Sequence, residues 1–178
     1  PSENYPRALQ EAANILFSAG DLNAVDDFFT EQRKKQPQGR ELSFSLHADT
    51  LDALGSISAI DILNEGVGAF PASVRLLFAR ANLLERADLF EQAEIDYRAV
   101  LTLSPGDSNA LNALGYALTN NTNRFTEAAG LLEEAFSKDP RNPAIIDSLG
   151  WVYFKLGKGR QAELLLKEAY QQYPDPEV

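Results

Sequence analysis

Five prolines recur along the 178-residue chain at an almost constant spacing. They are Pro37, Pro71, Pro105, Pro140 and Pro174, separated by 34, 34, 35 and 34 residues. Proline ends a helix because its nitrogen carries no hydrogen and its ring clashes with the preceding turn. A helix stop at every 34th residue predicts a chain of repeated helix–turn–helix units, since about 34 residues accommodate one such pair with its turns.

Small side chains recur at fixed places within this repeat. When each proline is set at position 32, the frames begin at residues 6, 40, 74, 108 and 143. One extra residue in the turn at residues 120–123 shifts the later positions of the fourth frame by one. Position 8 reads Ala13, His47, Ala81, Gly115 and Gly150; position 20 reads Val25, Ala59, Ala93, Ala128 and Ala162; position 27 reads Gln32, Gly66, Val100, Ala135 and Ala169. Small residues let two helices approach closely, so the sequence predicts that paired helices cross here.

The spacing predicts ten helices and no strand. Their expected ranges are residues 6–19, 23–35, 40–53, 56–67, 73–86, 89–102, 108–120, 125–138, 143–156 and 159–172. Asn142 is a predicted N-cap followed by Pro143 at the first helical position, where proline is tolerated. Ser73 and Ser108 are further predicted caps. Gly20 and Gly157 are predicted to lie in turns within their repeats.

The residues at these positions resemble the tetratricopeptide repeat (TPR) family. The resemblance is strongest in residues 112–116 and 149–153, which read Asn-Ala-Leu-Gly-Tyr and Leu-Gly-Trp-Val-Tyr. It covers residues 6–176 and implies an all-α fold, a right-handed α–α superhelix of five helix pairs in a single array. The repeats would span residues 6–39, 40–73, 74–107, 108–142 and 143–176. His47, Gln32 and Arg80 depart from the usual family residues.

The composition limits the classes of partner. The formal net charge is −10, so the chain gains nothing from contact with phosphates, and a nucleic-acid or anionic-membrane partner is not expected. No apolar run approaches the roughly 18 residues of a membrane span. The chain has no cysteine, which leaves out disulfides and thiol chemistry. It begins at Pro1 without methionine or a signal peptide, and we expect it to be a piece of a longer protein.

No combination of residues indicates catalysis. His47 is the only histidine, and the residues at i+3 and i+4, Thr50 and Leu51, offer it no acidic partner, so we interpret it as a packing residue. The adjacent carboxylates Asp26-Asp27 and Glu133-Glu134 would point about 100° apart on a helix and are interpreted as solvated surface. The glycine pairs near residues 66 and 157 lack the features of a phosphate loop. The sequence therefore predicts no enzyme activity, no cofactor and no metal.

The family resemblance implies a ligand surface on the first helix of each pair. In the family this helix lines the concave face, with positions 2, 5, 9, 12 and 13 toward the ligand. Carried over to this sequence, the predicted groove residues are Phe44, Phe78, Asn82, Asn112, Tyr116, Asp147, Trp151 and Phe154. Their aromatic rings and amides suit a polypeptide ligand. The alternative, that several of the aromatics fill the core, stays open, above all for Phe44 and Phe78.

A closer resemblance is carried by residues 112–119 and 147–152, by Tyr170 and by residues 173–178. These residues resemble the C-terminal repeats of large proteobacterial TPR lipoproteins. These are attached to the outer membrane and face the periplasm, and some resemble adaptors of a carboxyl-terminal-processing protease. The resemblance implies a non-catalytic periplasmic scaffold, outer-membrane-attached as a whole protein, with the protease and its substrates as partners. Two alternatives stay open: a regulatory or substrate-docking arm of a larger enzyme, and an oligomerisation module.

The C-terminal end carries its own expectation. Asp175-Pro176 repeats the pattern of Asn142-Pro143, so a further helix would begin there. Leu164, Leu165 and Leu166 span about 200° of their helix, more than one neighbouring helix can cover. We therefore expect an apolar patch that includes Tyr170 and self-association through the C-terminal helix.

Overall fold

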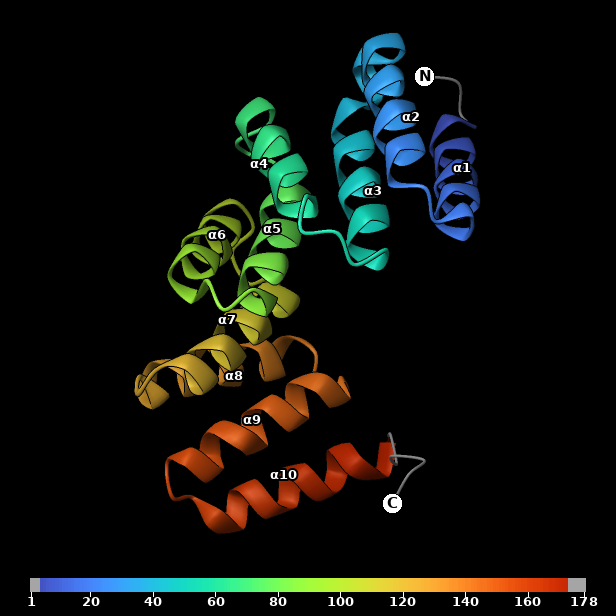
Figure 1. The fold of residues 1–178 in the computed structure, drawn as a ribbon. Helices are drawn as coiled ribbons and strands as arrows, with labels where there is room; N and C mark the ends of the chain where they lie inside the picture. The colour runs from blue at the N-terminus through green and yellow to red at the C-terminus, as the bar shows by residue number, and fades with distance from the viewer. Residues whose placement is uncertain (1–3, 173–178) are drawn as a thin grey trace. The chain divides into compact units, whose positions relative to one another are not determined.

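The computed structural model describes residues 4–172 of the chain. Within them lie ten α-helices and one short 3-10 helix, with no strand. The helices are α1 (Tyr5–Ala19), α2 (Leu22–Lys35), α3 (Arg40–Ala53), α4 (Ala59–Ala69), α5 (Val74–Arg86), α6 (Phe90–Leu103), α7 (Ser108–Asn121), α8 (Phe125–Lys138), α9 (Pro143–Lys155) and α10 (Gly159–Gln172), with the 3-10 helix η1 (Pro37–Gly39) between α2 and α3. The all-α prediction is confirmed, and within each unit consecutive helices turn back on each other (Figure 1).

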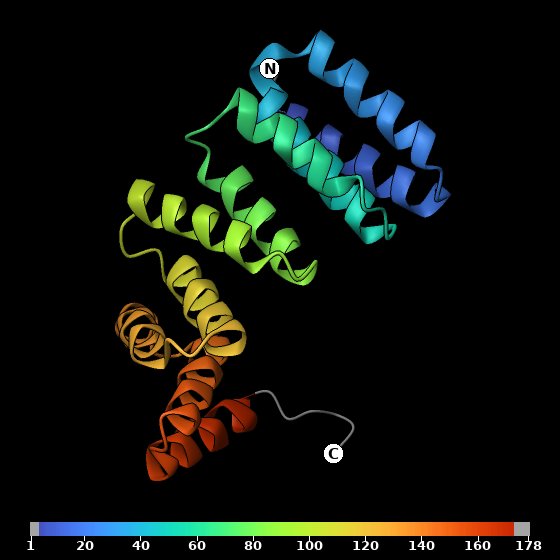
Figure 2. The ribbon, with the colours of Figure 1, turned by 60° about the vertical axis from the view of Figure 1, so that its left-hand side comes forward.

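The chain forms two compact units, one ending at Ala87 and the other beginning at Asp88. The first holds α1 to α5 and the second holds α6 to α10. In the first unit α3 packs against α1, α2, α4 and α5 (Figure 2). In the second unit α7 packs on α6, α8 and α9, and α9 packs on α8 and α10. The prediction of one continuous array over all five repeats stays a prediction.

Most helix ends lie where the sequence places them. Ser73 accepts a hydrogen bond from the Leu76 amide (3.1 Å), and Asn142 accepts one from the Ala144 amide (3.1 Å), so both predicted N-caps are confirmed. The predicted cap Ser108 is wrong by one residue. Asp107 is the cap, accepting from the Ala110 amide (3.0 Å), and Ser108 is the first helical residue. A carboxylate is favoured there because it also interacts with the helix dipole.

The start of α4 also differs from the predicted one. The predicted start of the fourth helix at residue 56 is wrong, because residues 56–58 form a turn and α4 begins at Ala59. Gly20 and Gly157 have φ angles of 68° and 74°, in the left-handed region that favours glycine, so both predicted turns are confirmed. The predictions for Pro174 and for Asp175-Pro176 concern residues outside the described part of the chain.

In the second unit the small positions of the repeat are buried between paired helices. Ala128 and Ala135 of α8 are each 0% exposed. At Gly115 a β-carbon would lie 2.6 Å from Cγ of Leu132, so α7 and α8 touch through a glycine that leaves no space for a side chain. At Gly150 the corresponding distance to Cγ of Leu166 on α10 is 2.9 Å. The helices therefore cross where the sequence predicts close approach.

No helix among residues 4–172 combines the length and the apolar character that crossing a membrane requires.

Candidate functional site

An aromatic and amide surface lies on α7 and α9 of the second unit. We call it the α7–α9 surface and define it by Asn112, Tyr116, Asn120, Trp151, Phe154 and Lys155. These two helices are the first members of their pairs and pack against each other. Asn112, Tyr116 and Asn120 follow one another at intervals of four residues, which places them on one face of α7. Trp151, Phe154 and Lys155 are spaced three and four residues apart on α9, so they too share a face.

Trp151 is held in a fixed orientation. Its Nε1 donates a hydrogen bond to Oδ1 of Asn120 on the neighbouring helix, at 2.9 Å. Its ring stacks on Phe154, with centroids 5.5 Å apart and planes inclined by 14°. The Lys155 ammonium lies 4.5 Å from the centre of the indole, within cation–π range. A ring fixed in this way loses little freedom when a ligand packs on it.

The neighbouring side chains are accessible. Tyr116 is 42% exposed and Phe154 is 58% exposed, although both are large apolar groups. Asn112 is half-buried, and its Oδ1 is a buried acceptor with no hydrogen-bond partner in the part of the chain that the structure describes. Exposed aromatics clustered on one face are typical of interaction sites. Of the predicted groove residues, the structure brings Asn112, Tyr116, Trp151 and Phe154 together here.

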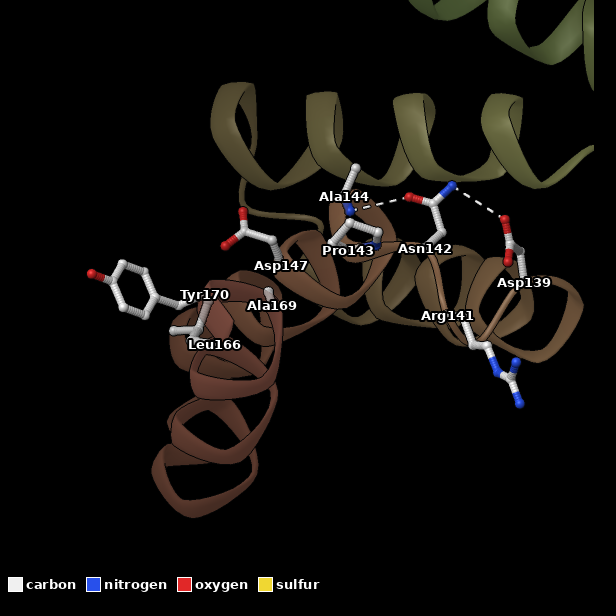
Figure 3. A pocket seen from close by; sticks show the side chains of 9 residues that line it. All are labelled: Asp139, Arg141, Asn142, Pro143, Ala144, Asp147, Leu166, Ala169 and Tyr170. Carbon is white, nitrogen blue, oxygen red and sulfur yellow. Dashed lines mark hydrogen bonds between the residues drawn. The ribbon is translucent and has the colours of Figure 1, made fainter. Parts of the chain in front are cut away.

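Asp147 lies on α9 but lines a cavity rather than the α7–α9 surface. It lines a cavity of about 900 Å³ at the end of the second unit, together with Asn142, Leu166, Ala169 and Tyr170 (Figure 3). Burial raises the pKa of the Asp147 carboxyl above its ordinary value. It is one turn of α9 from Trp151 in sequence, but its surroundings are those of the α9–α10 end.

Phe44 is a core residue rather than a groove residue. Only 4% of it is exposed, and it lies in the core of the first unit with Leu51, Leu63 and Leu76. Its ring fills the space beside Gly66, where a β-carbon would lie 3.1 Å from Phe44, and Arg33 covers the ring at 4.5 Å. The prediction that Phe44 contacts a ligand is therefore withdrawn.

Phe78 and Asn82 are half-buried on α5 of the first unit. Their membership of a ligand groove stays a prediction.

His47 belongs to a buried polar cluster in the first unit. The imidazole is 1% exposed and stacks on Phe29 with centroids 4.9 Å apart. Its Nε2 is 2.8 Å from Oδ1 of Asp26, and its Nδ1 is 3.1 Å from Nη1 of Arg33. The arginine can only donate, so Nδ1 accepts and Nε2 donates to Asp26. Both ring nitrogens are engaged in holding α2 against α3.

Burial and the neighbouring guanidinium of Arg33 lower the pKa of His47 to about 4, against the opposing effect of Asp26. At neutral pH the imidazole is therefore uncharged, and its lone pair is occupied by Arg33. A general base needs a lone pair that can reach a substrate, and His47 offers none. Its partners Asp26 and Arg33 are 21 and 14 residues away in sequence and lie on α2, so they are not at the i+3 and i+4 positions of its own helix.

The described residues contain no group of three or more histidine, aspartate or glutamate side chains arranged to hold a metal ion. One ionic cluster of these residues joins neighbouring helices. In the second unit Glu94 of α6 bonds both Arg98 and Arg124, and Arg98 also bonds Glu127 of α8. These contacts lower the pKa of Glu94, with the hydrogen bond from Arg124 as the largest cause. The two carboxylates and the two guanidinium groups of this cluster therefore neutralise one another's charge.

Comparison with known families identifies this repeat. Family models described as tetratricopeptide repeat match residues 58–108, 78–143 and 121–178, which together extend from residue 58 to residue 178. The chain belongs to the tetratricopeptide repeat family. The TPR match includes both helices of the α7–α9 surface. Residues before 58 show the same helix pairing in the structure.

Two curated proteins are similar to this chain in sequence. A TPR repeat-containing protein of Pseudomonas aeruginosa is 33% identical over 179 residues, which cover 100% of this chain and 30% of the relative. Bacteriophage adsorption protein A of Escherichia coli strain K12 is 30% identical over 148 residues, covering 83% of this chain and 15% of the relative. The chain thus spans less than a third of the length of either relative.

Solved structures share the fold at low sequence identity. A TPR protein of Parabacteroides merdae is 15% identical with a TM-score of 0.78, covering 96% of this chain and 68% of its own. The MamA protein is 16% identical with a TM-score of 0.74, covering 98% of both chains. YrrB, a TPR protein with an unusual peptide-binding site, is 17% identical with a TM-score of 0.71, covering 93% of this chain and 84% of its own.

The predicted apolar patch at α10 can be tested by self-association. Leu164 is 71% exposed and Tyr170 is 48% exposed. Tyr170 lines both the 900 Å³ cavity and a second cavity of about 720 Å³ beside Phe154.

We expect the sedimentation coefficient of the chain to rise with its concentration, because exposed apolar surface favours contact with a second copy. Tyr170→Glu should abolish the rise. Tyr116→Glu, the same change at an equally exposed tyrosine on the α7–α9 surface, should not. A chain that stays monomeric at millimolar concentration would refute the prediction.

Proposed function

We propose that this chain is a non-catalytic scaffold that binds an extended or helical segment of another polypeptide on the α7–α9 surface. The observation that carries the proposal is the fixed Trp151 ring, which is held by Asn120 and stacks on the accessible ring of Phe154, while the accessible Tyr116 lies one helical turn from Asn120 on α7. Large rigid aromatic groups supply most of the affinity in protein interfaces. The asparagines on the same face can pair with a peptide backbone, because an amide side chain both donates and accepts.

The wider biological setting of the proposal comes from resemblance. We propose that the whole protein acts in the periplasm, attached to the outer membrane, as an adaptor that presents substrates to a carboxyl-terminal-processing protease. The motif in residues 112–119 and 147–152 supports this, as does the match over the full chain to a TPR protein of Pseudomonas aeruginosa. The peptide-binding site named for YrrB supports a peptide as the ligand class, by likeness of fold.

The single tryptophan of the chain is Trp151, so its fluorescence reports directly on the proposed site. Twelve-residue peptides selected on the purified chain from a random display library should change the Trp151 emission on titration. Tyr116→Ala and Phe154→Ala, which keep the reporter, should each weaken binding about tenfold or more, as for aromatic anchors in other interfaces.

The matched control is Ile95→Ala, which removes an exposed apolar side chain from α6 of the same unit, outside the α7–α9 surface, and should leave the affinity unchanged. Circular dichroism would check that each variant is folded. Selected peptides that bind without any change in Trp151 emission, and that bind the Tyr116 and Phe154 variants as tightly as the parent, would show that the surface is not the ligand site.

A further inference from the structure

A small pocket lies between α1 and α3 in the first unit, on the first helices of two neighbouring pairs. Its volume is about 250 Å³, and its lining comes from both helices. The lining residues are Gln10, Ala13, Asn14, Phe17, Leu46, Asp49, Thr50 and Ala53. Pockets for whole small molecules have volumes of roughly 300–1,000 Å³. This one is below that range and suits a single long side chain.

Asp49 is the one charged residue in that lining. Its carboxylate is at the surface but partly enclosed, and the burial raises its pKa, as does the charge of Asp52 one turn along α3. The guanidinium of Arg75 on α5 and a hydrogen bond with Ser45 act in the opposite direction. Asp52 is itself paired with Arg86 at 2.6 Å. Additional positive charge in the pocket would therefore stabilise an enclosed carboxylate.

The other walls suit a flat cation. Phe17 is 48% exposed, so one side of its ring can accept a cation–π contact. Gln10 and Asn14 are both exposed on α1, where Nε2 of Gln10 donates to Oδ1 of Asn14 at 3.3 Å and orients the two amides. Leu46 and Ala13 close the base with apolar surface that fits a methylene stem. Thr50 directs its hydroxyl away, to the Leu46 carbonyl at 2.7 Å.

We infer that the α1–α3 pocket receives the guanidinium group of an arginine in the bound polypeptide, with Asp49 as its counter-ion and Phe17 beside its face. Guanidinium is planar and can present two parallel N–H groups to one carboxylate, whereas an ammonium acts as a point charge. The inference rests on the proposed function and deepens it, by naming arginine as a side chain that a polypeptide partner presents to the first unit.

The test uses the whole chain, labelled with ¹⁵N, and N-acetyl-arginine amide as the probe. The amide resonances of Asn14, Asp49 and Thr50 should shift and saturate on titration. N-acetyl-citrulline amide, which has nearly the same shape without the charge, should bind at least about tenfold more weakly, because the charge-assisted hydrogen bond is lost. Asp49→Asn should weaken binding of the arginine probe by a similar factor.

Asp61→Asn is the matched control, because it removes an equally negative side chain from α4 of the same unit, outside the pocket. It should leave the titration unchanged. Equal binding of the two probes, shifts that spread over the surface carboxylates without saturating, or an Asp49→Asn variant that binds like the parent would each overturn the inference. The Trp151 titration of the other unit is independent, so failure here leaves the peptide-binding proposal to its own test.

Discussion

Replacing Gly115 by alanine should lower the free energy of unfolding by about 2 kcal/mol, although alanine is the better helix former by about 1 kcal/mol. The added β-carbon would lie 2.6 Å from Cγ of Leu132 and 3.2 Å from the carbonyl oxygen of Ala128. Leu132 is 0% exposed, so it has no free space into which to move. The remaining response is to separate α7 from α8, which weakens the packing on which α9 also rests.

Gly130 provides the matched control on α8. It is exposed in the middle of the helix, and a β-carbon there would have nothing within 4 Å. Gly130→Ala should therefore stabilise the chain by about 0.5–1 kcal/mol through helix propensity alone. Gly150→Ala should lie between the two, because the Leu166 side chain that it meets at 2.9 Å is only half-buried.

Urea unfolding followed by circular dichroism and by Trp151 fluorescence measures all three variants. The decisive quantity is the difference between the Gly115 and Gly130 variants, about 3 kcal/mol in total, since both carry the same chemical change. If the two variants change stability equally, close packing does not explain the glycine of α7.

The helix–turn–helix pattern could be predicted from the sequence because it recurs in successive repeats. The proline spacing and most of the small positions are found in several frames, so a single departing residue such as His47 does not change the helix prediction. Asn142 followed by Pro143 identified a helix start to the residue. Ser108 did not, because two adjacent residues, Asp107 and Ser108, can both cap, and sequence alone does not say which of them has the extended backbone.

The sequence predicts only in part which side chains of the groove are accessible to a ligand. Periodicity places residues on one face of a helix, but it does not say whether that face meets another helix or solvent. The sequence leaves groove and core open for Phe44, which lies in the core because Gly66, on the paired helix, has no side chain to fill the space. Trp151 and Phe154 stack as neighbours on α9, a contact that three-residue spacing permits.

The cluster around His47 had no signal in the local sequence. Its partners Asp26 and Arg33 lie on another helix, and the register between α2 and α3 decides that they meet. The one available indication was the departure itself, a histidine at a position where the other repeats have alanine or glycine. A bulky polar residue at a crossing point needs hydrogen-bond partners, because an unsatisfied buried polar group is unfavourable.

This cluster should make the stability of the first unit fall in mild acid. In the unfolded chain the imidazole has the ordinary pKa of 6.5, whereas in the folded chain burial and Arg33 lower it to about 4. As the pH falls below 6.5 the unfolded state takes up a proton that the folded state does not, so unfolding is favoured. The contribution is fully present above pH 6.5 and is lost progressively down to pH 4. The difference between the two pKa values corresponds to a change of roughly 3 kcal/mol in the free energy of unfolding.

His47→Gln isolates the histidine from the carboxylates that titrate in the same range. Glutamine can accept from Arg33 and donate to Asp26 as the neutral imidazole does, but it takes up no proton. The free energy of unfolding, measured in urea at pH 7.5, 6.5, 5.5 and 4.5, should fall more steeply for the parent than for the variant. The extra slope approaches about 1.4 kcal/mol per pH unit, the limit for one proton. Parallel curves for the two proteins would mean that His47 binds its proton equally well in both states, and that the buried contact with Arg33 does not hold the ring neutral.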